Sequence, residues 1–289
     1  MKRDKRRTFA ATTVLIAPFV ILLAALAAAG PSLREWGQKR QHGGEPQSID
    51  INLYTFWTDR DLGDCAIFGF KLDRFERELV TRTKDLFGLS VRSVPIRIHL
   101  YHNHDELERF LKRTTSWKGD FTHNGGYYNP AGSEIAIEMT GDEREDISGL
   151  FHEVTHALFN LSAERARWSP WVAEGVATWL ARSEIGPEGA VRLGGIDHRF
   201  LAINREGPLP LREFLEADHS QFTTAQNRYY YAQAHLLFAF LVERHRDRLA
   251  AYLKSEMSGV KVGPATFEST FGPIPDIEKE FADFVKSLN

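Results

Sequence analysis

A short helical motif with two histidines constrains this chain more than any other feature of its sequence. Residues 151–157 read Phe-His-Glu-Val-Thr-His-Ala, so His152 and His156 are four residues apart, with Glu153 between them. Side chains four apart lie on one face of an α-helix, where both imidazoles can reach the same metal ion. Apolar residues recur at helical spacing toward the opposite face, at Ile147, Leu150, Val154, Leu158 and Leu161. The pattern predicts a half-buried helix near residues 143–160.

The metal that this motif favours is zinc. Cys65 is the one cysteine of the chain, so neither a cysteine-based zinc site nor a disulfide within the chain can form. Nitrogen and oxygen ligands must therefore hold any metal, and imidazoles with a carboxylate are typical of catalytic zinc. Glu153 lies beside both histidines and is expected to act as general base on a water molecule. The sequence thus predicts one zinc ion as cofactor, bound by His152 and His156.

A second segment provides the expected third ligand. Catalytic zinc sites use three protein ligands and leave one position for water. Ser169 is suited to the N-cap of a helix and Pro170 to its first turn. Glu174 lies one turn inside this helix, and a helix–loop–helix return would bring its carboxylate back to the histidines. Gly175 and Ala177 are small, so we expect these two helices to pack closely, with Glu174 as the third metal ligand.

Together these segments resemble the gluzincin peptidases, and in particular the bacterial peptidase MA-like family. The resemblance rests on the Gly-Tyr-Tyr hairpin at 126–130, the His-Glu-x-x-His motif, and Ser-Pro-Trp-Val-Ala-Glu-Gly-Val-Ala at 169–177. It extends over residues 95–288 and implies a thermolysin-like catalytic core, with the edge of a small sheet along the substrate cleft. It also implies the activity of a zinc metallopeptidase that hydrolyses peptide bonds in a protein or peptide substrate.

The resemblance further implies an oxyanion-stabilising tyrosine. Related zinc aminopeptidases carry Tyr-x-x-Gly after the third ligand, and the segment that begins at Tyr231 is similar, with alanine in place of glycine. A fixed donor at the carbonyl oxygen lowers the barrier to hydrolysis, and Tyr229 and Tyr230 are rivals for this role.

Two departures limit the resemblance. Thr178 stands where many gluzincins have an acidic residue, and no Gly-x-Met-x-Asn stretch precedes the zinc motif, so aminopeptidase specificity is not supported.

The N-terminal segment predicts export. A basic cluster at 2–7 precedes an apolar run at 9–29, which is long enough to span a bilayer. The positive-inside rule keeps the basic cluster in the cytoplasm, and the alanines at 27–29 offer a signal-peptide cleavage site. Residues 1–29 are therefore expected to be a signal peptide or an N-terminal membrane anchor. The rest would face the outside or the periplasm, or be secreted, and the Gly- and Pro-rich residues 30–48 are expected to be a linker.

The remaining chain predicts an α+β fold. Alternating apolar residues indicate strands at 49–54 and 96–100, and turn residues at 125–133 indicate a hairpin that ends in a strand at 134–138. Helical spacing indicates helices at 70–87, 105–113, 143–160, 170–182, 197–204, 209–217, 224–246 and 276–288. We expect a small mixed sheet within residues 49–140, the strand-containing part of the peptidase domain. A mainly helical zinc-binding part, the zincin core, is expected to follow over 141–289.

Other features leave alternatives open. A net charge of −3 gives no basic surface, so no nucleic-acid partner is expected. His99, His102 and His104 are close in sequence and suggest a second metal site, and His235 is expected to line the cleft one turn after Tyr231. Two other functions share the predicted site: a zinc amidohydrolase that acts on a non-peptide substrate, and a catalytically silent binding or scaffold protein of the same fold.

Overall fold

The computed structural model describes residues 47–59, 62–114, 125–163, 166–223, 226–259 and 262–288. Apart from Asp59, these residues belong to one compact unit, which takes in Gln47–Thr58 and the chain from Leu62 onward. The expected targeting segment at 1–29 lies outside the described residues, as does the expected linker up to residue 46. None of the described helices combines the length and the apolar character needed to cross a membrane.

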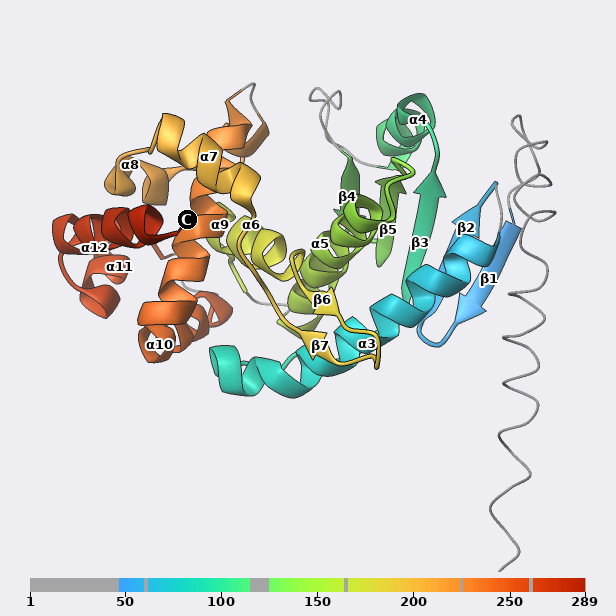
Figure 1. Cartoon of the computed structure of the whole chain (residues 1–289), viewed down its shortest axis with the longest axis horizontal. Coiled ribbons are helices and arrows are strands. Elements are labelled where there is room, and N and C mark those ends of the chain that lie inside the picture. The colour runs from blue at the N-terminus through green and yellow to red at the C-terminus, as the bar shows by residue number, and fades with distance from the viewer. Residues whose placement is uncertain are drawn as a thin grey trace, which may run out of the picture. The chain divides into compact units, whose positions relative to one another are not determined.

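A five-stranded mixed sheet forms one side of this unit (Figure 1). Its strands are β1 (Gln47–Ile51), β2 (Tyr54–Thr58), β3 (Ile96–Tyr101), β4 (Gly126–Asn129) and β5 (Glu134–Glu138), in the spatial order β1-β2-β3-β5-β4. The three central strands are parallel, and the two edge strands are antiparallel to their neighbours. The long helix α3 (Leu62–Phe87) connects β2 to β3, and α4 (His104–Thr114) follows β3. The prediction of a small mixed sheet is therefore confirmed.

The first strands differ from the prediction of a single strand at 49–54. The chain forms a hairpin there, because Asn52 takes a left-handed conformation with φ of 54° and reverses its direction. Asparagine tolerates this conformation better than most residues, since its short side chain can bond to the nearby backbone. The apolar alternation continues through the turn, so it could not reveal this break. Strand β1 also begins at Gln47, inside the expected linker.

Helix α5 (Glu143–Ser162) packs against β4, β5 and α3 on the sheet side, while α6 (Pro170–Leu180) and α9 (Asn227–Arg244) form the centre of the other side. The helix α6 contacts both α5 and α9. A Cβ atom at Gly175 would lie 2.7 Å from the Ala234 carbonyl oxygen and 3.0 Å from Phe238 Cβ, both on α9. The small Gly175 therefore serves the contact between α6 and α9, and not the α5–α6 contact that we expected.

Shorter elements complete the fold. They are the hairpin of β6 (Glu184–Ile185) and β7 (Val191–Arg192), the 3-10 helix η1 (Gln221–Thr223), and helices α7 (His198–Glu206), α8 (Leu211–Glu216), α10 (Arg246–Met257), α11 (Pro264–Phe271) and α12 (Ile274–Ser287). Helices α10 and α11 and the β6–β7 hairpin were not predicted. The α+β class, with a small sheet and mostly helices, is confirmed.

Aromatic packing anchors α5 on the sheet side of the unit. Phe151, the residue before the first motif histidine, stacks on Phe75 of α3 with ring centroids 4.1 Å apart. Both rings are completely buried, and a buried phenylalanine contributes about 2–3 kcal/mol of transfer free energy. Phe151 thus fixes the rotation of α5, so that the next residue, His152, faces away from this core.

Candidate metal centre

The two motif histidines and Glu174 converge on one point. His152 Nε2 and His156 Nε2 are 3.0 Å apart, and Glu174 Oε2 lies 3.4 Å from the first and 3.5 Å from the second. These side chains keep 14–19% of their surface exposed and line a cleft. Within the described residues, no other group of histidine, cysteine, aspartate and glutamate ligand atoms comes together in this way. This group can hold a metal ion.

The spacing and bonding of the three ligand atoms fit such an ion. Ligand atoms at 2.0–2.1 Å from a tetrahedral zinc ion are roughly 3.3 Å from one another, which is close to the three measured separations. Glu174 Oε2 is buried and accepts no hydrogen bond from the residues that the structure describes. A buried carboxylate oxygen without a partner is costly, and a cation at the shared point would remove this cost.

The electrostatics of Glu174 suit a ligand. Burial alone would raise the pKa of Glu174, but the charge of His156 and the close approach of both imidazoles hold it well below its usual range. Burial lowers the pKa of His156, but the neighbouring carboxylates of Glu174 and Glu153 outweigh this and raise it. Glu174 is therefore ionised at any physiological pH, as a metal ligand must be.

The start of α6 places Glu174, and it differs in one respect from the prediction. Ser169 is the N-cap residue and Pro170 the first helical residue, as expected, but the Ser169 side chain does not cap the helix. Its hydroxyl instead donates to Glu256 Oε1 of α10 at 2.6 Å, and its backbone N–H donates to Glu256 Oε2 at 2.8 Å. A tertiary contact, which the local sequence does not reveal, thus fixes the beginning of α6.

Glu153 lies beside the metal group under the edge strand β4. Its side chain is buried, and the backbone N–H of Tyr128 donates to its carboxylate. A Cβ atom at Gly126 would lie 2.8 Å from Glu153 Oε1, so glycine is needed there for the strand to approach. Burial raises the pKa of Glu153, while the two histidines oppose this shift. A carboxylate with a raised pKa is a stronger proton acceptor than an ordinary one.

Tyr231 reaches the same site from α9. It lines the cleft with the metal group, and its phenol contacts the Glu174 carboxylate. Burial and the charges of Glu174 and Glu153 raise the pKa of Tyr231 well above its usual value. The phenol therefore stays protonated and keeps a hydrogen to donate. Its rival Tyr230 packs instead against Phe214 and Phe222.

These residues share one cleft of about 620 Å³. Strand β4, the end of α5, the α5–α6 connection and α9 contribute aromatic and polar walls, which include Tyr127, Tyr128, Phe159, Arg167, Trp168 and Tyr231. A cleft of this size accommodates several residues of an extended peptide. Arg167 and Trp168 were not singled out from the sequence, because only the folded connection between α5 and α6 brings them to the cleft.

The other histidines that the structure describes do not come together as a second metal site. His104 Nδ1 is 2.9 Å from Glu138 Oε2, and His102 Nε2 is 3.5 Å from Thr58 Oγ1, so these rings bind different partners. His99 lies between aromatic rings, stacked on Trp57. Among the described residues, the suggestion of a cluster is therefore wrong.

His235 has a structural place instead of lining the cleft. It is completely buried, and its Nε2 accepts a hydrogen bond from the Asp197 N–H at 2.9 Å. Burial lowers the pKa of His235 to about 4, so the ring is neutral.

Thr178 stands where many gluzincins have an acidic residue. Its hydroxyl donates to the Glu174 carbonyl oxygen at 2.6 Å within its own helix.

A scan against protein-family models found no match for this chain, and a search among curated proteins found no similar sequence. The residues of the site are therefore what indicate its chemistry.

Proposed function

We propose that this chain is a zinc-dependent metallopeptidase of the gluzincin type, with a thermolysin-like catalytic core. The observation that supports this most is the convergence of His152, His156 and Glu174 beside Glu153 in one cleft. A purely structural zinc site would be closed by a fourth protein ligand. Here three ligands are open to the cleft and a buried carboxylate stands next to them, which favours catalysis over a silent scaffold.

In this proposal, each residue has a separate task. A bound zinc ion would supply a Lewis acid that polarises the scissile carbonyl and activates water. Glu153 accepts a proton from the attacking water and passes it to the leaving amine, and its raised pKa suits both steps. Tyr231 donates its hydroxyl hydrogen to the carbonyl oxygen as negative charge develops there. Burial around the carboxylates strengthens these interactions, because the local dielectric is low.

The proposed place of action is outside the cytoplasm. It is supported by the basic cluster at 2–7 and the apolar run at 9–29, which lie outside the described residues. We expect the full chain to fractionate with the membrane if this segment is retained, and with the periplasm or the medium if it is cleaved. Recovery of the intact chain in the cytoplasmic fraction would contradict export.

Variants of three site residues test the mechanism. Glu153→Gln should keep zinc and lower kcat at least 10³-fold, because it removes the proton acceptor but no ligand. Tyr231→Phe should keep zinc and lower kcat about 10²-fold, as expected for the loss of one oxyanion donor. Glu174→Ala should lose the metal. Metal analysis of the purified protein and cleavage of a peptide library give both readouts on the same samples.

The same assays separate the alternatives. Purified protein that takes up no zinc, or a Glu153→Gln variant as active as the wild type, would refute the mechanism. Turnover of small amides with no cleavage in the peptide library would point to an amidohydrolase. Zinc binding without any turnover would leave the scaffold function.

A further inference from the structure

The cleft carries an uneven distribution of charge. Of its two lining carboxylates, Glu174 belongs to the metal group and Glu153 lies beside it. Away from that group, the ionisable side chains other than tyrosine that the structure places along the cleft are Arg167 and His219. The part of the cleft beyond the metal group therefore presents the Arg167 guanidinium and hydrogen-bond donors, and none of the described residues that line it there is a carboxylate.

The connection between α5 and α6 presents Arg167 in a fixed position. The Arg167 N–H donates to the Glu256 carbonyl oxygen at 3.1 Å, and two residues later the Ser169 N–H and hydroxyl bind the Glu256 side chain. This segment is thus held from behind by α10. The Arg167 side chain is exposed, and within the described part of the chain no ion pair or hydrogen bond engages its guanidinium.

Trp168 adds a second donor beside this arginine. Its ring lies edge-on to Phe159, with centroids 5.9 Å apart, and both residues line the cleft. The indole Nε1–H is buried and has no hydrogen-bond partner among the described residues. An unpaired buried donor is uncommon in folded proteins, and an acceptor from a bound molecule would satisfy it after a small movement of the ring.

We infer that Arg167 is a specificity-determining residue that binds a carboxylate of the peptide substrate, with the Trp168 indole as an auxiliary donor. This inference rests on the proposed peptidase function. A guanidinium in a partly enclosed cleft forms strong paired hydrogen bonds with a carboxylate. The carboxylate has two sources in a peptide, the free C-terminus and an aspartate or glutamate side chain. Because Arg167 and the metal group line the same cleft, this contact would place the scissile bond relative to that carboxylate.

Matched peptides separate the two sources. One series has a free C-terminus or a C-terminal amide at increasing distance from the scissile bond, and the other has internal glutamate or glutamine. In one of the two series, the zinc-loaded wild type should cleave the peptide with the carboxylate with a kcat/KM roughly tenfold higher than that for the matched peptide without it. The series that shows this difference identifies the source of the carboxylate. Arg167→Gln should remove this preference, and Arg167→Glu should reverse it toward a lysine-bearing peptide.

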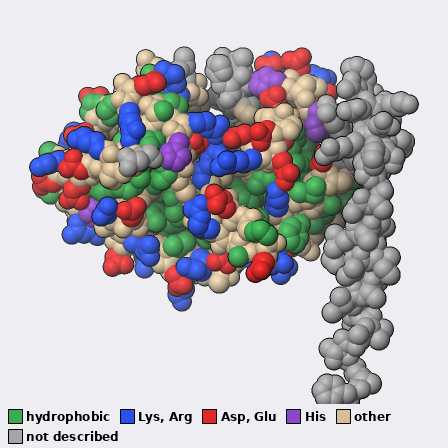
Figure 2. Space-filling view, viewed as in Figure 1, with side chains coloured by type: hydrophobic (Ala, Val, Ile, Leu, Met, Phe, Trp, Pro, Cys, Tyr) green, Lys and Arg blue, Asp and Glu red, His purple; other side chains and the backbone are tan. Residues whose placement is uncertain are grey.

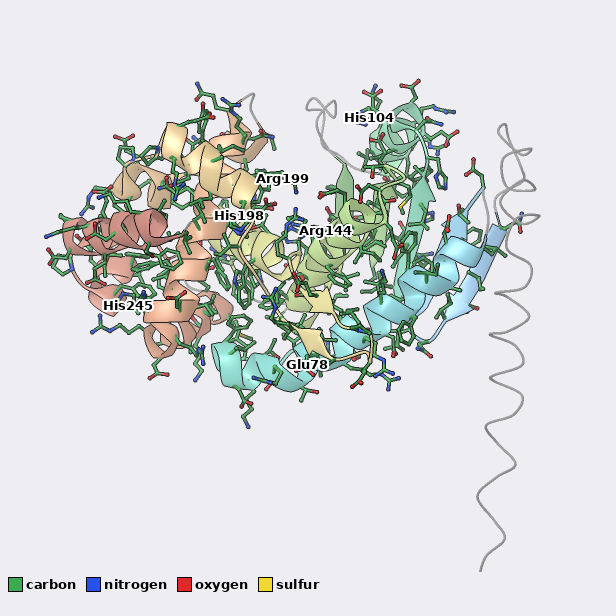
Figure 3. All side chains as sticks on the ribbon, viewed as in Figure 1. Glu78, His104, Arg144, His198, Arg199 and His245 are labelled. Atoms are coloured by element: carbon green, nitrogen blue, oxygen red, sulfur yellow. The ribbon has the colours of Figure 1, made fainter. Side chains whose placement is uncertain are left out.

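Arg144→Gln is the matched control. Arg144 is also an exposed arginine, but it lines a separate hollow of about 460 Å³ between α3, α5 and the β6–β7 hairpin. Figure 3 shows it near Arg199, and Figure 2 shows basic and acidic side chains gathered on this face. The substitution makes the same change in net charge as Arg167→Gln. Because Arg144 lies outside the cleft, its substitution should leave the preference for the carboxylate peptide intact.

A binding measurement keeps the inference separate from catalysis. In the zinc-loaded Glu153→Gln variant, the carboxylate peptide should bind about tenfold more tightly than its amide, and adding Arg167→Gln should remove the difference.

If peptides are cleaved or bound without regard to their carboxylates, the role of Arg167 is wrong while the peptidase function stands. If no peptide is cleaved but carboxylate binding depends on Arg167, the peptidase function fails and the carboxylate site remains. Equal selectivity in Arg167→Gln and Arg144→Gln would overturn the inference.

Discussion

At the residue scale, the surroundings of two carboxylates in the cleft shift their pKa values in opposite directions. Burial raises the pKa of Glu153, whereas the approach of two imidazoles holds the pKa of Glu174 well below its usual range. One carboxylate is thus a better proton acceptor, and the other remains ionised as a ligand. Titratable groups whose environments push their pKa values apart commonly divide acid–base and electrostatic tasks in an active site.

Gly126 offers a test of how closely Glu153 must be held. In Gly126→Ala the new methyl group would lie 2.8 Å from Glu153 Oε1, so the carboxylate or the strand must move. We expect zinc content and folding to be retained and kcat to fall at least tenfold, because a misplaced base loses its alignment with the attacking water. The assay compares kcat with zinc content for each variant.

Gly125→Ala is the control, since a Cβ atom there meets no atom within 4 Å. If Gly126→Ala retained full activity, or if both substitutions lowered activity equally, close contact between β4 and Glu153 would not matter for turnover.

Much of the site could be predicted from single residues, because its ligands follow from local geometry. His152, Glu153 and His156 depend on one helical repeat, and Glu174 depends on a recognisable helix start. Tyr231 came from resemblance, and the structure brings it to the same cleft. The contact of Gly126 with Glu153 could not be predicted, since it joins a strand and a helix across the fold, where sequence spacing carries no information.

At the element scale, hydrogen bonds to α10 fix the start of α6, the helix that carries the third ligand. The Glu256 side chain accepts from the Ser169 N–H and hydroxyl, and its backbone carbonyl accepts from the Arg167 N–H. Burial raises the pKa of Glu256 to about 7, although the hydrogen bonds from Ser169 act in the other direction. A proton on Glu256 therefore favours the folded state near neutral pH.

This shift predicts a pH dependence of stability. Between pH 4.5 and 7 the folded chain keeps a proton on Glu256 that the unfolded chain releases, so the free energy of unfolding falls as pH rises through this window. The full effect of a shift of this size is about 3 kcal/mol.

Glu256→Gln resembles the protonated acid and should remove this fall in stability. The variant should therefore be more stable than the wild type at pH 8 and equal to it at pH 5. Thermal unfolding at both pH values measures the difference, and a variant less stable at pH 8 would contradict it.

Element boundaries were harder to predict than element types. The strands β3 and β5 and the helices α5 and α6 lie close to their predicted ranges, since each carries a clear period. The predicted helix at 224–246 ends at Arg244, and α10 begins at Arg246, so a single residue, His245, separates two helices. A break of one residue barely disturbs a helical pattern. The resulting change in direction depends on packing, and the packing of His245 against Phe240 and Phe271 is tertiary.

At the scale of the whole molecule, the metal group joins two helices with different supports. Helix α5 is anchored through Phe151 on the sheet side, while α6 is packed against α9 and tied to α10. An ion held by ligands from both helices therefore links the two sides of the unit. Binding to the folded state alone stabilises a protein in proportion to the logarithm of ligand excess.

We accordingly expect zinc to raise the melting temperature. At a free zinc concentration about 1,000 times Kd, the gain is about 4 kcal/mol, which corresponds to roughly 10 °C for a domain of this size. A chelator should reverse the shift, and Glu174→Ala should show none. Calorimetry with and without the ion provides the measurement. An equal shift in the wild type and in Glu174→Ala would place the stabilising metal elsewhere.

The position of α6 between two helices also has a consequence for synthesis. Its partner on one side, α5, precedes it in the chain, but α9 begins only at Asn227. A nascent chain that has passed residue 180 thus holds a strongly apolar helix, which includes Trp171, Val176 and Trp179, before its second cover exists. Exposed apolar surface of this kind makes partly folded chains prone to aggregation. We therefore expect the helix that carries Glu174 to stay partly uncovered until the segment from Asn227 onward has been made.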